Sequence, residues 1–391
     1  MSSHSVTEIT LLSHAKGVDL GSFSLTASDL GLPASVPINV EQVELVGGKK
    51  QGSRVITLTV GEVTVRVVPT RAMAILEATR DGVRFGWDSP VKEVVHPWFI
   101  EQESAGGLGW LDGFNEMLVR CGYQWAGHPG VDNGQLLTLH GRIQNTPADE
   151  VVLKVDTKPP YRVRLSGRVD EKRFKLTNYE VHTELALALD DPRIQITDRL
   201  KNLSHYENEY QAIYHNNFGR PILEAGARLH IPCKKISPFN AYAAQGLDQW
   251  STMPTPTEGF DEQVFNIEPI SDDTGVSYAL MENADQSKGI EVAYDTSTLP
   301  VLTVWKNTDT EEQGYVVGLE PGTSYAYNRR YQRPLGLVPK LAGKSDVVFR
   351  VSFGLLTHAE EVAHARQRIQ ALQERHPAEV LMTPLVQLDK D

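Results

Sequence analysis

Residues 55–67 read Val55-Ile56-Thr57-Leu58-Thr59-Val60-Gly61-Glu62-Val63-Thr64-Val65-Arg66-Val67, and they decide the fold class. Apolar and polar side chains alternate on both sides of Gly61-Glu62. This alternation is typical of a half-buried β-strand, because successive side chains of a strand point to opposite faces. Two such runs separated by two residues with a glycine indicate an antiparallel hairpin with a tight turn.

Similar short runs recur along the chain. Turn-forming segments such as Lys158-Pro159-Pro160 and Asp190-Asp191-Pro192 separate them, and 31 glycines and 22 prolines are spread over the whole length. Many short strands with few helical stretches predict an all-β protein, here a large antiparallel β-sandwich. The predicted strands are Glu150–Asp156, Tyr161–Val169, Val181–Leu189, Arg193–Leu200, Ala227–Ile231, Val276–Met281, Gly289–Tyr294, Val301–Trp305, Tyr315–Leu319 and Val347–Phe353.

We expect one domain over residues 1–391, because no repeat and no linker divides the chain. Residues 1–45 are expected to form an N-terminal extension and residues 357–391 a C-terminal helix and tail. The helix should begin near Thr357, where Thr357-His358-Ala359-Glu360 has capping-box spacing, and end before Pro377. Its apolar face would consist of Val362, Ala365, Ile369 and Leu372. A second, shorter helix is predicted at Asp112–Val119.

Composition restricts the function classes. The net charge of −12 argues against a nucleic-acid or anionic-membrane partner, because both need clustered Lys and Arg. No run approaches the roughly 18 apolar residues of a membrane helix, and no signal peptide is visible, so we expect a cytoplasmic protein. The two cysteines, Cys121 and Cys233, are too few for a disulfide scaffold and lack metal-site spacing.

The best candidate for chemistry is His215, in Tyr214-His215-Asn216-Asn217-Phe218-Gly219. An imidazole has an unperturbed pKa of about 6.5, which suits proton transfer near neutral pH. The predicted partner is Glu320, in Gly318-Leu319-Glu320-Pro321-Gly322. Phosphate loops, dinucleotide fingerprints, His-Glu-x-x-His and Gly-x-Ser-x-Gly are all absent from the sequence. This leaves acid–base chemistry from His, Asp and Glu, with no cofactor and no metal expected.

Several motifs occur in an order that resembles the aldose 1-epimerase (galactose mutarotase-like) superfamily. They are Arg71, His140-Gly141, His215-Asn216-Asn217-Phe218, Gly259-Phe260-Asp261 and Leu319-Glu320-Pro321. The likeness covers roughly residues 71–355. Further motifs point to the branch known as DUF4432, a domain of unknown function: Trp110-Leu111-Asp112-Gly113-Phe114, Cys121-Gly122, His140-Gly141-Arg142-Ile143 and Glu262-Gln263-Val264.

The chain departs from the family pattern at two of these motifs. A single glycine and Arg142 follow His140, where mutarotases usually have two glycines, and His215-Asn216-Asn217-Phe218 replaces His-x-Tyr-Phe-Asn. Both motifs belong to the sugar pocket of the family, so the identity of the sugar does not transfer.

The resemblance implies a galactose mutarotase-like supersandwich and a cofactor-independent isomerase of a monosaccharide or sugar derivative. A base removes the anomeric hydroxyl proton, an acid protonates the ring oxygen, and the opened sugar recloses on its other face. Glu320 would be the base and His215 the acid. The expected substrate-binding residues are Arg71, His140, Arg142, Asp261, Glu262, Trp305 and Lys306. The cations among them would favour a phosphorylated or acidic sugar.

The residues alone leave alternatives open. His215 could be a core histidine, Glu320 a turn residue paired with downstream arginines, and Trp305 a core aromatic. Asp261 and Glu262 compete for one role. A sugar isomerase acting at another carbon and a carbohydrate-binding protein without catalysis are the competing functions, and the oligomeric state is open.

Overall fold

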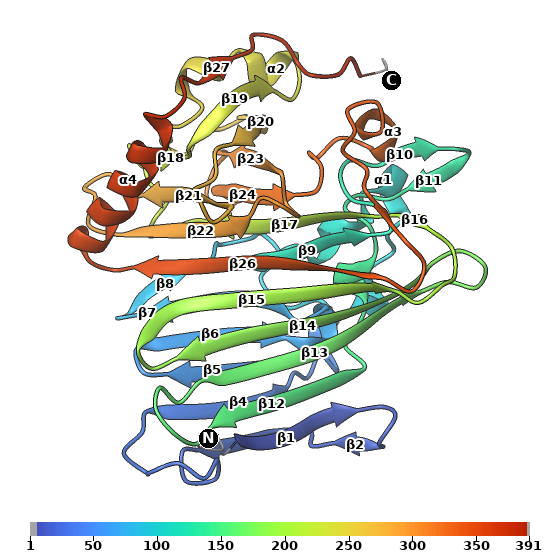
Figure 1. The fold of residues 1–391 in the computed structure, drawn as a ribbon, viewed down its shortest axis with the longest axis vertical. Helices are drawn as coiled ribbons and strands as arrows, with labels where there is room; N and C mark the ends of the chain where they lie inside the picture. The colour runs from blue at the N-terminus through green and yellow to red at the C-terminus, as the bar shows by residue number, and fades with distance from the viewer. Residues whose placement is uncertain (1–5, 389–391) are drawn as a thin grey trace.

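The computed structural model describes residues 6–388, and most of its strands lie in two large sheets packed face to face (Figure 1). Neighbouring strands are antiparallel, apart from a short parallel pairing between β19 (Cys233–Pro238) and β27 (Glu379–Val380). Helix α4 (Ala359–Gln373) packs beside β18, β21 and β26. The predicted all-β sandwich with a C-terminal helix is confirmed.

The first sheet has ten strands, in the order β18-β21-β22-β26-β15-β14-β13-β12-β1-β2. Their bounds are β1 Val6–Ser13, β2 Val18–Asp19, β12 Glu150–Asp156, β13 Val163–Lys172, β14 Asn178–Ala188, β15 Asp191–Asn202, β18 Arg228–His230, β21 Val276–Glu282, β22 Gly289–Asp295 and β26 Asp346–Leu356.

The second sheet has thirteen strands, in the order β27-β19-β20-β23-β24-β17-β9-β7-β6-β5-β4-β3, with β8 paired to β7. Besides β19 and β27, their bounds are β3 Phe23–Thr26, β4 Ile38–Glu44, β5 Arg54–Val60, β6 Val63–Val68, β7 Ala74–Arg80, β8 Val83–Phe85, β9 Leu118–Tyr123, β17 Gln211–Phe218, β20 Gln263–Pro269, β23 Val301–Asn307 and β24 Val316–Gly322.

Short elements fill the connections between the sheets. Two small strand pairs are β10 Gly130–Asp132 with β11 Gln135–Leu137, and β16 Asn208–Glu209 with β25 Lys340–Leu341. The other α-helical turns are α1 Ser104–Gly107, α2 Ala241–Ala244 and α3 Arg329–Gln332. Turns of 3₁₀ helix lie at Gly48–Lys50, Pro69–Arg71, Pro97–Phe99, Gly109–Gly113, Ile143–Asn145 and Leu247–Gln249.

The hairpin that decides the fold class forms as predicted. Strands β5 and β6 pair with Val60 opposite Val63, and Gly61 takes a positive φ of 62° in the turn between them. Val63, Val65 and Val67 are buried in the core between the sheets, because they occupy alternate positions on one face of the strand.

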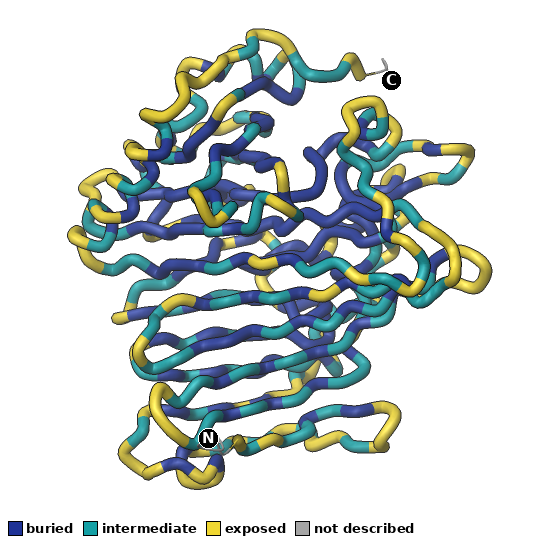
Figure 2. The backbone as a smooth tube through the Cα atoms, in the orientation of Figure 1, coloured by how far each residue is buried: buried dark blue, intermediate teal, exposed yellow. Residues whose placement is uncertain are grey.

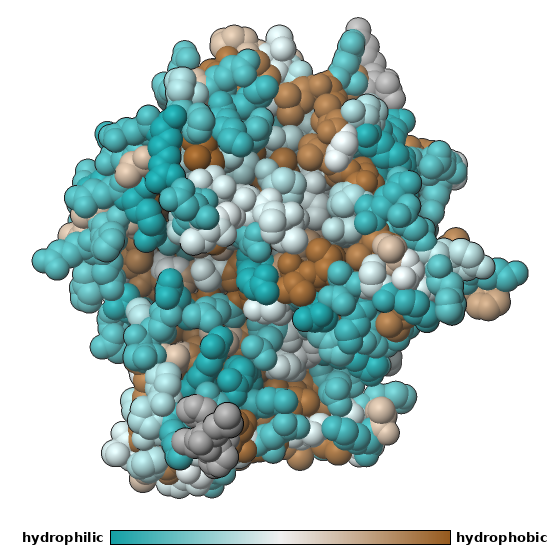
Figure 3. All heavy atoms as spheres, viewed as in Figure 1, coloured by the Kyte–Doolittle hydropathy of each residue, from teal (hydrophilic) through white to brown (hydrophobic). Residues whose placement is uncertain are grey.

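The two sheets differ in how much of their surface is covered. Burial alternates along β12, β13 and β15 of the ten-stranded sheet, as Figure 2 shows on the nearer layer. That face carries mostly hydrophilic residues with scattered hydrophobic areas (Figure 3). By contrast, every residue of β9, β17 and β24 in the thirteen-stranded sheet is buried. Polar residues on these strands therefore need partners inside the protein or a ligand.

Some predicted details were wrong. No helix forms at Asp112–Val119, where the chain passes from the 3₁₀ turn at Gly109–Gly113 into β9. The capping box does not form either. His358 is the N-cap without a side-chain cap bond, whereas the Thr357 hydroxyl is hydrogen-bonded to Asp81. Within residues 1–45, β1 joins the ten-stranded sheet, and β3 and β4 join the thirteen-stranded sheet.

The predicted strands recur with small changes of boundary, and Val362, Ala365, Ile369 and Leu372 are buried on α4 as expected. Cys121 and Cys233 are buried free thiols. Across residues 6–388, no helix combines the length and the apolar character needed to cross a membrane.

A buried ion pair joins the two sheets beneath β17. Arg120 on β9 donates to Asp198 on β15, and its remaining N–H groups reach Thr183 Oγ1 and the carbonyls of Ala72 and Met73. The hydroxyl of Tyr214 also donates to Asp198, at 2.8 Å. Because all these polar groups are paired, their burial is tolerated in an apolar core.

We predict that Asp198→Asn lowers the free energy of unfolding by about 3–5 kcal/mol, because Arg120 then keeps a buried charge without its counter-ion. Urea denaturation measures this. The matched control is Asp346→Asn, since Asp346 pairs with Arg199 at the surface and should cost about 1 kcal/mol or less. Equal effects of the two substitutions would contradict the prediction.

Candidate active site

Strand register brings His215 and Glu320 together. On β17 and β24, Asn216 pairs with Leu319 and Asn217 with Gly318, so His215 lies directly opposite Glu320. Thr303 on β23 pairs with Glu320 from the other side. Directly opposite residues of antiparallel strands share one face of the sheet, so these three side chains point the same way. The His215 Nε2 and Glu320 Oε1 atoms are 3.2 Å apart.

These side chains line a pocket that opens on the face of the thirteen-stranded sheet turned away from the ten-stranded sheet. The residues that line it are Leu108, Trp110, Leu111, Phe114, His128, Leu139, His140, His215, Glu262, Val264, Thr303, Trp305, Glu320 and Ala326. They come from loops and strands spread over more than 200 positions of the chain. The predicted convergence of residues 215 and 320 in one hollow is therefore present.

The pocket contains buried polar atoms that have no hydrogen-bond partner. They are Trp110 Nε1, His140 Nδ1 and Thr303 Oγ1. Buried polar groups in native proteins are almost always paired, and an unpaired one costs about 1–3 kcal/mol. Three such atoms around one hollow indicate a site built for a ligand with several hydrogen-bonding groups.

The protonation state of His215 follows from its neighbour Asn217. The Asn217 amide nitrogen donates to the Glu116 carbonyl at 3.0 Å, which turns its oxygen toward His215 Nδ1 at 2.7 Å. Nδ1 must then carry the proton, and the lone pair of Nε2 faces Glu320. Burial lowers the pKa of His215 to about 4, and the Asn217 bond offsets only part of this effect.

Glu320 has the opposite shift. Burial raises the pKa of its carboxyl well above the ordinary value, and the nearby charge of Glu262 raises it further. Burial thus favours the carboxylic acid form of Glu320 and the neutral form of the His215 imidazole. Burial and the neighbouring histidines His215 and His128 lower the pKa of His140 well below its usual value, so His140 is neutral too.

Three of the predicted binding residues lie in the pocket. His140 packs its ring against Trp110 and edge-on to His215, with centroid distances of 4.9 and 5.2 Å. Trp305 forms a wall, with its ring 5.4 Å from that of His215, and its Nε1 donates to Glu262 Oε2 at 2.6 Å. Between the two acidic candidates, Glu262 lines the pocket.

Asp261 and the three predicted cations, Arg71, Arg142 and Lys306, do not line the pocket. Asp261 is exposed, and its carboxylate caps the backbone N–H of Glu262. Arg71 is completely buried, does not line the pocket, and donates to Glu116, Asn145 Oδ1 and the Gly113 carbonyl.

Lys306 follows Trp305 on β23, and strand alternation turns it to the opposite face, where it donates to the carbonyls of Gln249 and Thr252. Arg142 lines a separate hollow with Ile100 and Glu103. The cations that suggested a phosphorylated or acidic sugar are therefore outside the pocket.

Sequence reasoning missed several lining residues. Thr303 could have been found, since it lies two positions before Trp305 and so on the same face of β23. Trp110 and Phe114 lie in a motif used only to recognise the branch. His128 carries no local signal, because only the tertiary structure brings its loop to the sheet. The ring of His128 lies against Phe239 with a centroid distance of 5.1 Å.

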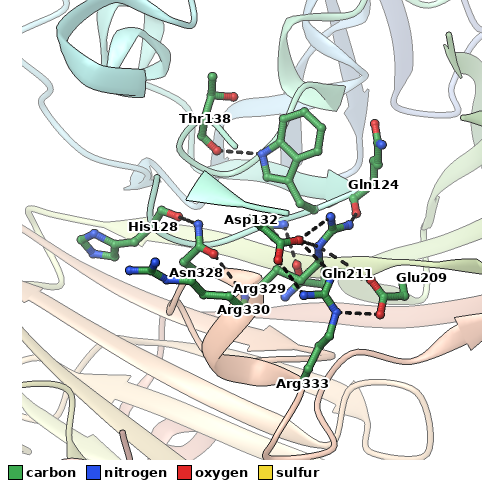
Figure 4. A network of polar contacts seen from close by, with 12 residues as sticks. Gln124, His128, Asp132, Thr138, Glu209, Gln211, Asn328, Arg329, Arg330 and Arg333 are labelled. Atoms are coloured by element: carbon green, nitrogen blue, oxygen red, sulfur yellow. Dashed lines mark hydrogen bonds and ion pairs between the residues drawn. The ribbon is translucent and has the colours of Figure 1, made fainter. Parts of the chain in front are cut away.

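A polar network holds the loop of His128 in place (Figure 4). Asp132 on the β10–β11 hairpin accepts hydrogen bonds from both Arg329 and Arg333, at 2.7–3.0 Å, and Arg333 also binds Glu209. Asn328 donates to the His128 carbonyl. The segment after β24 is thereby tied to the loop that carries His128.

Comparisons with known proteins agree with this architecture. The family model "Domain of unknown function (DUF4432)" matches residues 50–355. A solved structure from Klebsiella pneumoniae subsp. pneumoniae, named as a candidate aldose 1-epimerase, is 42% identical with a TM-score of 0.96, covering 98% of this chain and 100% of that one. The chain belongs to the DUF4432 family.

More distant structures share the fold of this DUF4432 protein. A galactose mutarotase-like protein from Clostridium acetobutylicum has a TM-score of 0.55 at 13% identity, covering 81% of this chain and 98% of that one. Galactose 1-epimerase from Lactobacillus acidophilus has a TM-score of 0.53 at 11% identity, covering 81% and 99%. The predicted galactose mutarotase-like fold is thus confirmed. The comparison with curated proteins found no match.

Because Gly318 has no side chain, it leaves space for the Glu320 carboxyl. A Cβ atom at residue 318 would lie 2.6 Å from Glu320 Oε1 and 3.2 Å from Trp305 Cβ. We predict that Gly318→Ala pushes this carboxyl away from His215 and from the pocket, and lowers the melting temperature by only a few degrees. A crystal structure of the variant would show the displacement. Gly354→Ala on β26 is the control, because its nearest atoms lie at 3.4 Å. An unmoved Glu320 in the Gly318 variant would contradict the prediction.

Proposed function

We propose that this DUF4432 protein is an aldose 1-epimerase-like isomerase that interconverts the anomers of a monosaccharide without a cofactor. The observation that carries the proposal is the facing pair of His215 Nε2 and Glu320 Oε1, 3.2 Å apart in a pocket with unpaired polar atoms. The name of the Klebsiella pneumoniae relative, an aldose 1-epimerase candidate, supports the same reaction class.

The proposed mechanism uses the single proton of the pair. The neutral His215 imidazole removes the anomeric hydroxyl proton while the Glu320 carboxylic acid protonates the ring oxygen, and the C1–O5 bond breaks. The open-chain aldehyde then rotates about C1–C2. On closure, the imidazolium returns its proton to the carbonyl oxygen, and the carboxylate takes back the proton of the attacking hydroxyl.

This assignment reverses the roles expected from the sequence, where Glu320 was the base and His215 the acid. The reason is burial, which favours the neutral form of each group. One proton transfer across the pair interconverts the two assignments, so both anomers can enter the same cycle. His140 and Thr303, which have unpaired polar atoms, are proposed to bind the sugar hydroxyls.

We predict that His215→Ala and Glu320→Gln each lower kcat by about 10²–10⁴-fold, because a positioned acid or base contributes that much. Polarimetry of freshly dissolved α-anomers, checked by exchange NMR between anomer signals, measures the rate above the spontaneous reaction. The control is His182→Ala with Glu180→Gln. These residues form a His–Glu pair at 2.6 Å in the ten-stranded sheet, away from the pocket, and should leave kcat unchanged.

The same assay decides between the competing functions. Anomer exchange in heavy water without deuterium on carbon supports a mutarotase. Deuterium on a carbon atom would support an isomerase that acts at another position, and sugar binding with no exchange would support a binding protein.

The pH dependence of kcat/KM should reflect the lowered pKa of the buried His215. We predict that activity is kept from pH 7 down to pH 5 and is lost as the pH falls through about 4, where His215 becomes protonated and no longer acts as a base. An exposed imidazole would already lose activity near pH 6.5. The profile is measured in buffers that do not themselves catalyse mutarotation, and a midpoint near 6.5 would refute the assignment of His215 as the base.

A further inference from the structure

One wall of the pocket is almost entirely apolar. The segment 108–114 contributes Leu108, Trp110, Leu111 and Phe114, and Leu139 extends this surface. Trp110 Nε1 is the only side-chain hydrogen-bonding atom among these five residues. Trp110 and Phe114 also pack against each other, with ring centroids 4.8 Å apart.

The hydrogen-bonding groups come from other elements. Thr303 and Glu320 project from strands β23 and β24, Glu262 precedes β20, and His128 lies in the loop tied to α3. Glu262 already accepts the Trp305 N–H. A pyranose seated with its anomeric carbon at His215 and Glu320 can therefore satisfy hydroxyls on one side, whereas a hydroxyl packed against the side chains of Leu108, Leu111 or Leu139 finds no partner there.

The pocket also lacks a cation among its lining residues within the described chain. Two buried cations lie on strands of the thirteen-stranded sheet near the pocket, and both are already paired. Arg120 on β9 pairs with Asp198, and Lys306 on β23 donates to two backbone carbonyls. Glu262 contributes a carboxyl at the pocket. A phosphate or carboxylate group on the sugar would thus be desolvated beside an acidic residue with no counter-ion.

We propose that the pocket selects an uncharged deoxy sugar, with the carbon that lacks a hydroxyl packed against Leu108, Leu111 and Leu139. This proposal rests on the proposed function, since it takes the anomeric carbon to lie between His215 and Glu320. It adds the substrate class, which the family assignment does not give.

The test compares matched pairs of sugars that differ by one group. Galactose is compared with 6-deoxygalactose and 2-deoxygalactose, ribose with 2-deoxyribose, and glucose with glucuronate and glucose 6-phosphate. For at least one pair, kcat/KM for the deoxy sugar should exceed that for its parent by about 5-fold or more, because leaving a buried hydroxyl unpaired costs at least about that factor. The two anionic sugars should react at least about 100-fold more slowly than glucose.

A variant pair localises the effect to the apolar wall. Leu111 lines the pocket and is 44% exposed, so Leu111→Asn can fold and offers a hydroxyl a partner. It should lower the preference for the deoxy sugar by about fivefold or more. The matched control is Leu136→Asn, because Leu136 is 38% exposed on β11 but does not line the pocket, and the preference should stay as in the wild type.

Calorimetric titration with the same sugars keeps this test separate from that of the proposed function. If no sugar is interconverted, the proposed function fails, and the ratio of dissociation constants within each pair decides the substrate class instead. Tighter binding or faster turnover of a deoxy sugar that Leu111→Asn weakens supports the proposal. It is overturned if every parent sugar does as well as its deoxy analogue, if the anionic sugars react as fast as glucose, or if the preference is unchanged in Leu111→Asn.

Discussion

The register between β17 and β24 is the constraint on which the candidate site depends. Since Asn216 pairs with Leu319, His215 must face Glu320, and a shift by one residue would turn His215 into the core and Tyr214 into the pocket. The ion pair of Arg120 with Asp198, which Tyr214 also contacts, opposes such a shift from the core side. These polar contacts in the core therefore keep His215, which follows Tyr214, on the pocket side of the strand.

Burial then sets the chemistry of the pair. In water, a carboxyl is ionised at neutral pH and an imidazole titrates close to neutral pH. In this pocket, the rings of Trp110, Phe114 and Trp305 surround the imidazole, and the carboxyl is buried among the strands. The low polarity favours the neutral form of each group, and Asn217 selects which imidazole nitrogen carries the proton. The outcome is a donor and an acceptor aimed at one hollow, which is what a reversible proton exchange with a sugar needs.

The three cationic residues predicted to bind the substrate show that residue type and motif position do not determine which side chains reach the pocket. Arg71, Arg142 and Lys306 occur next to or within motifs of the site, yet each lies outside the pocket for a different reason: Arg71 is paired with Glu116, Lys306 is on the reverse face of its strand, and Arg142 lines another hollow. What remains around the pocket is a mixture of aromatic, aliphatic and polar side chains, with the acidic Glu262 and without Lys or Arg. This composition is the basis for proposing an uncharged sugar with a reduced number of hydroxyls.

The sequence alone determined the fold class, most strands, helix α4 and the pairing of His215 with Glu320 as candidates, because alternation and motif order are local or linear properties of the chain. It also placed His140 and Trp305 among the pocket residues, and it left Asp261 and Glu262 competing for one role. It could not reveal His128, the apolar wall at residues 108–114 or the protonation of the pair. Only the tertiary structure decided these, because they depend on which loop covers the sheet and on how much water the covering removes.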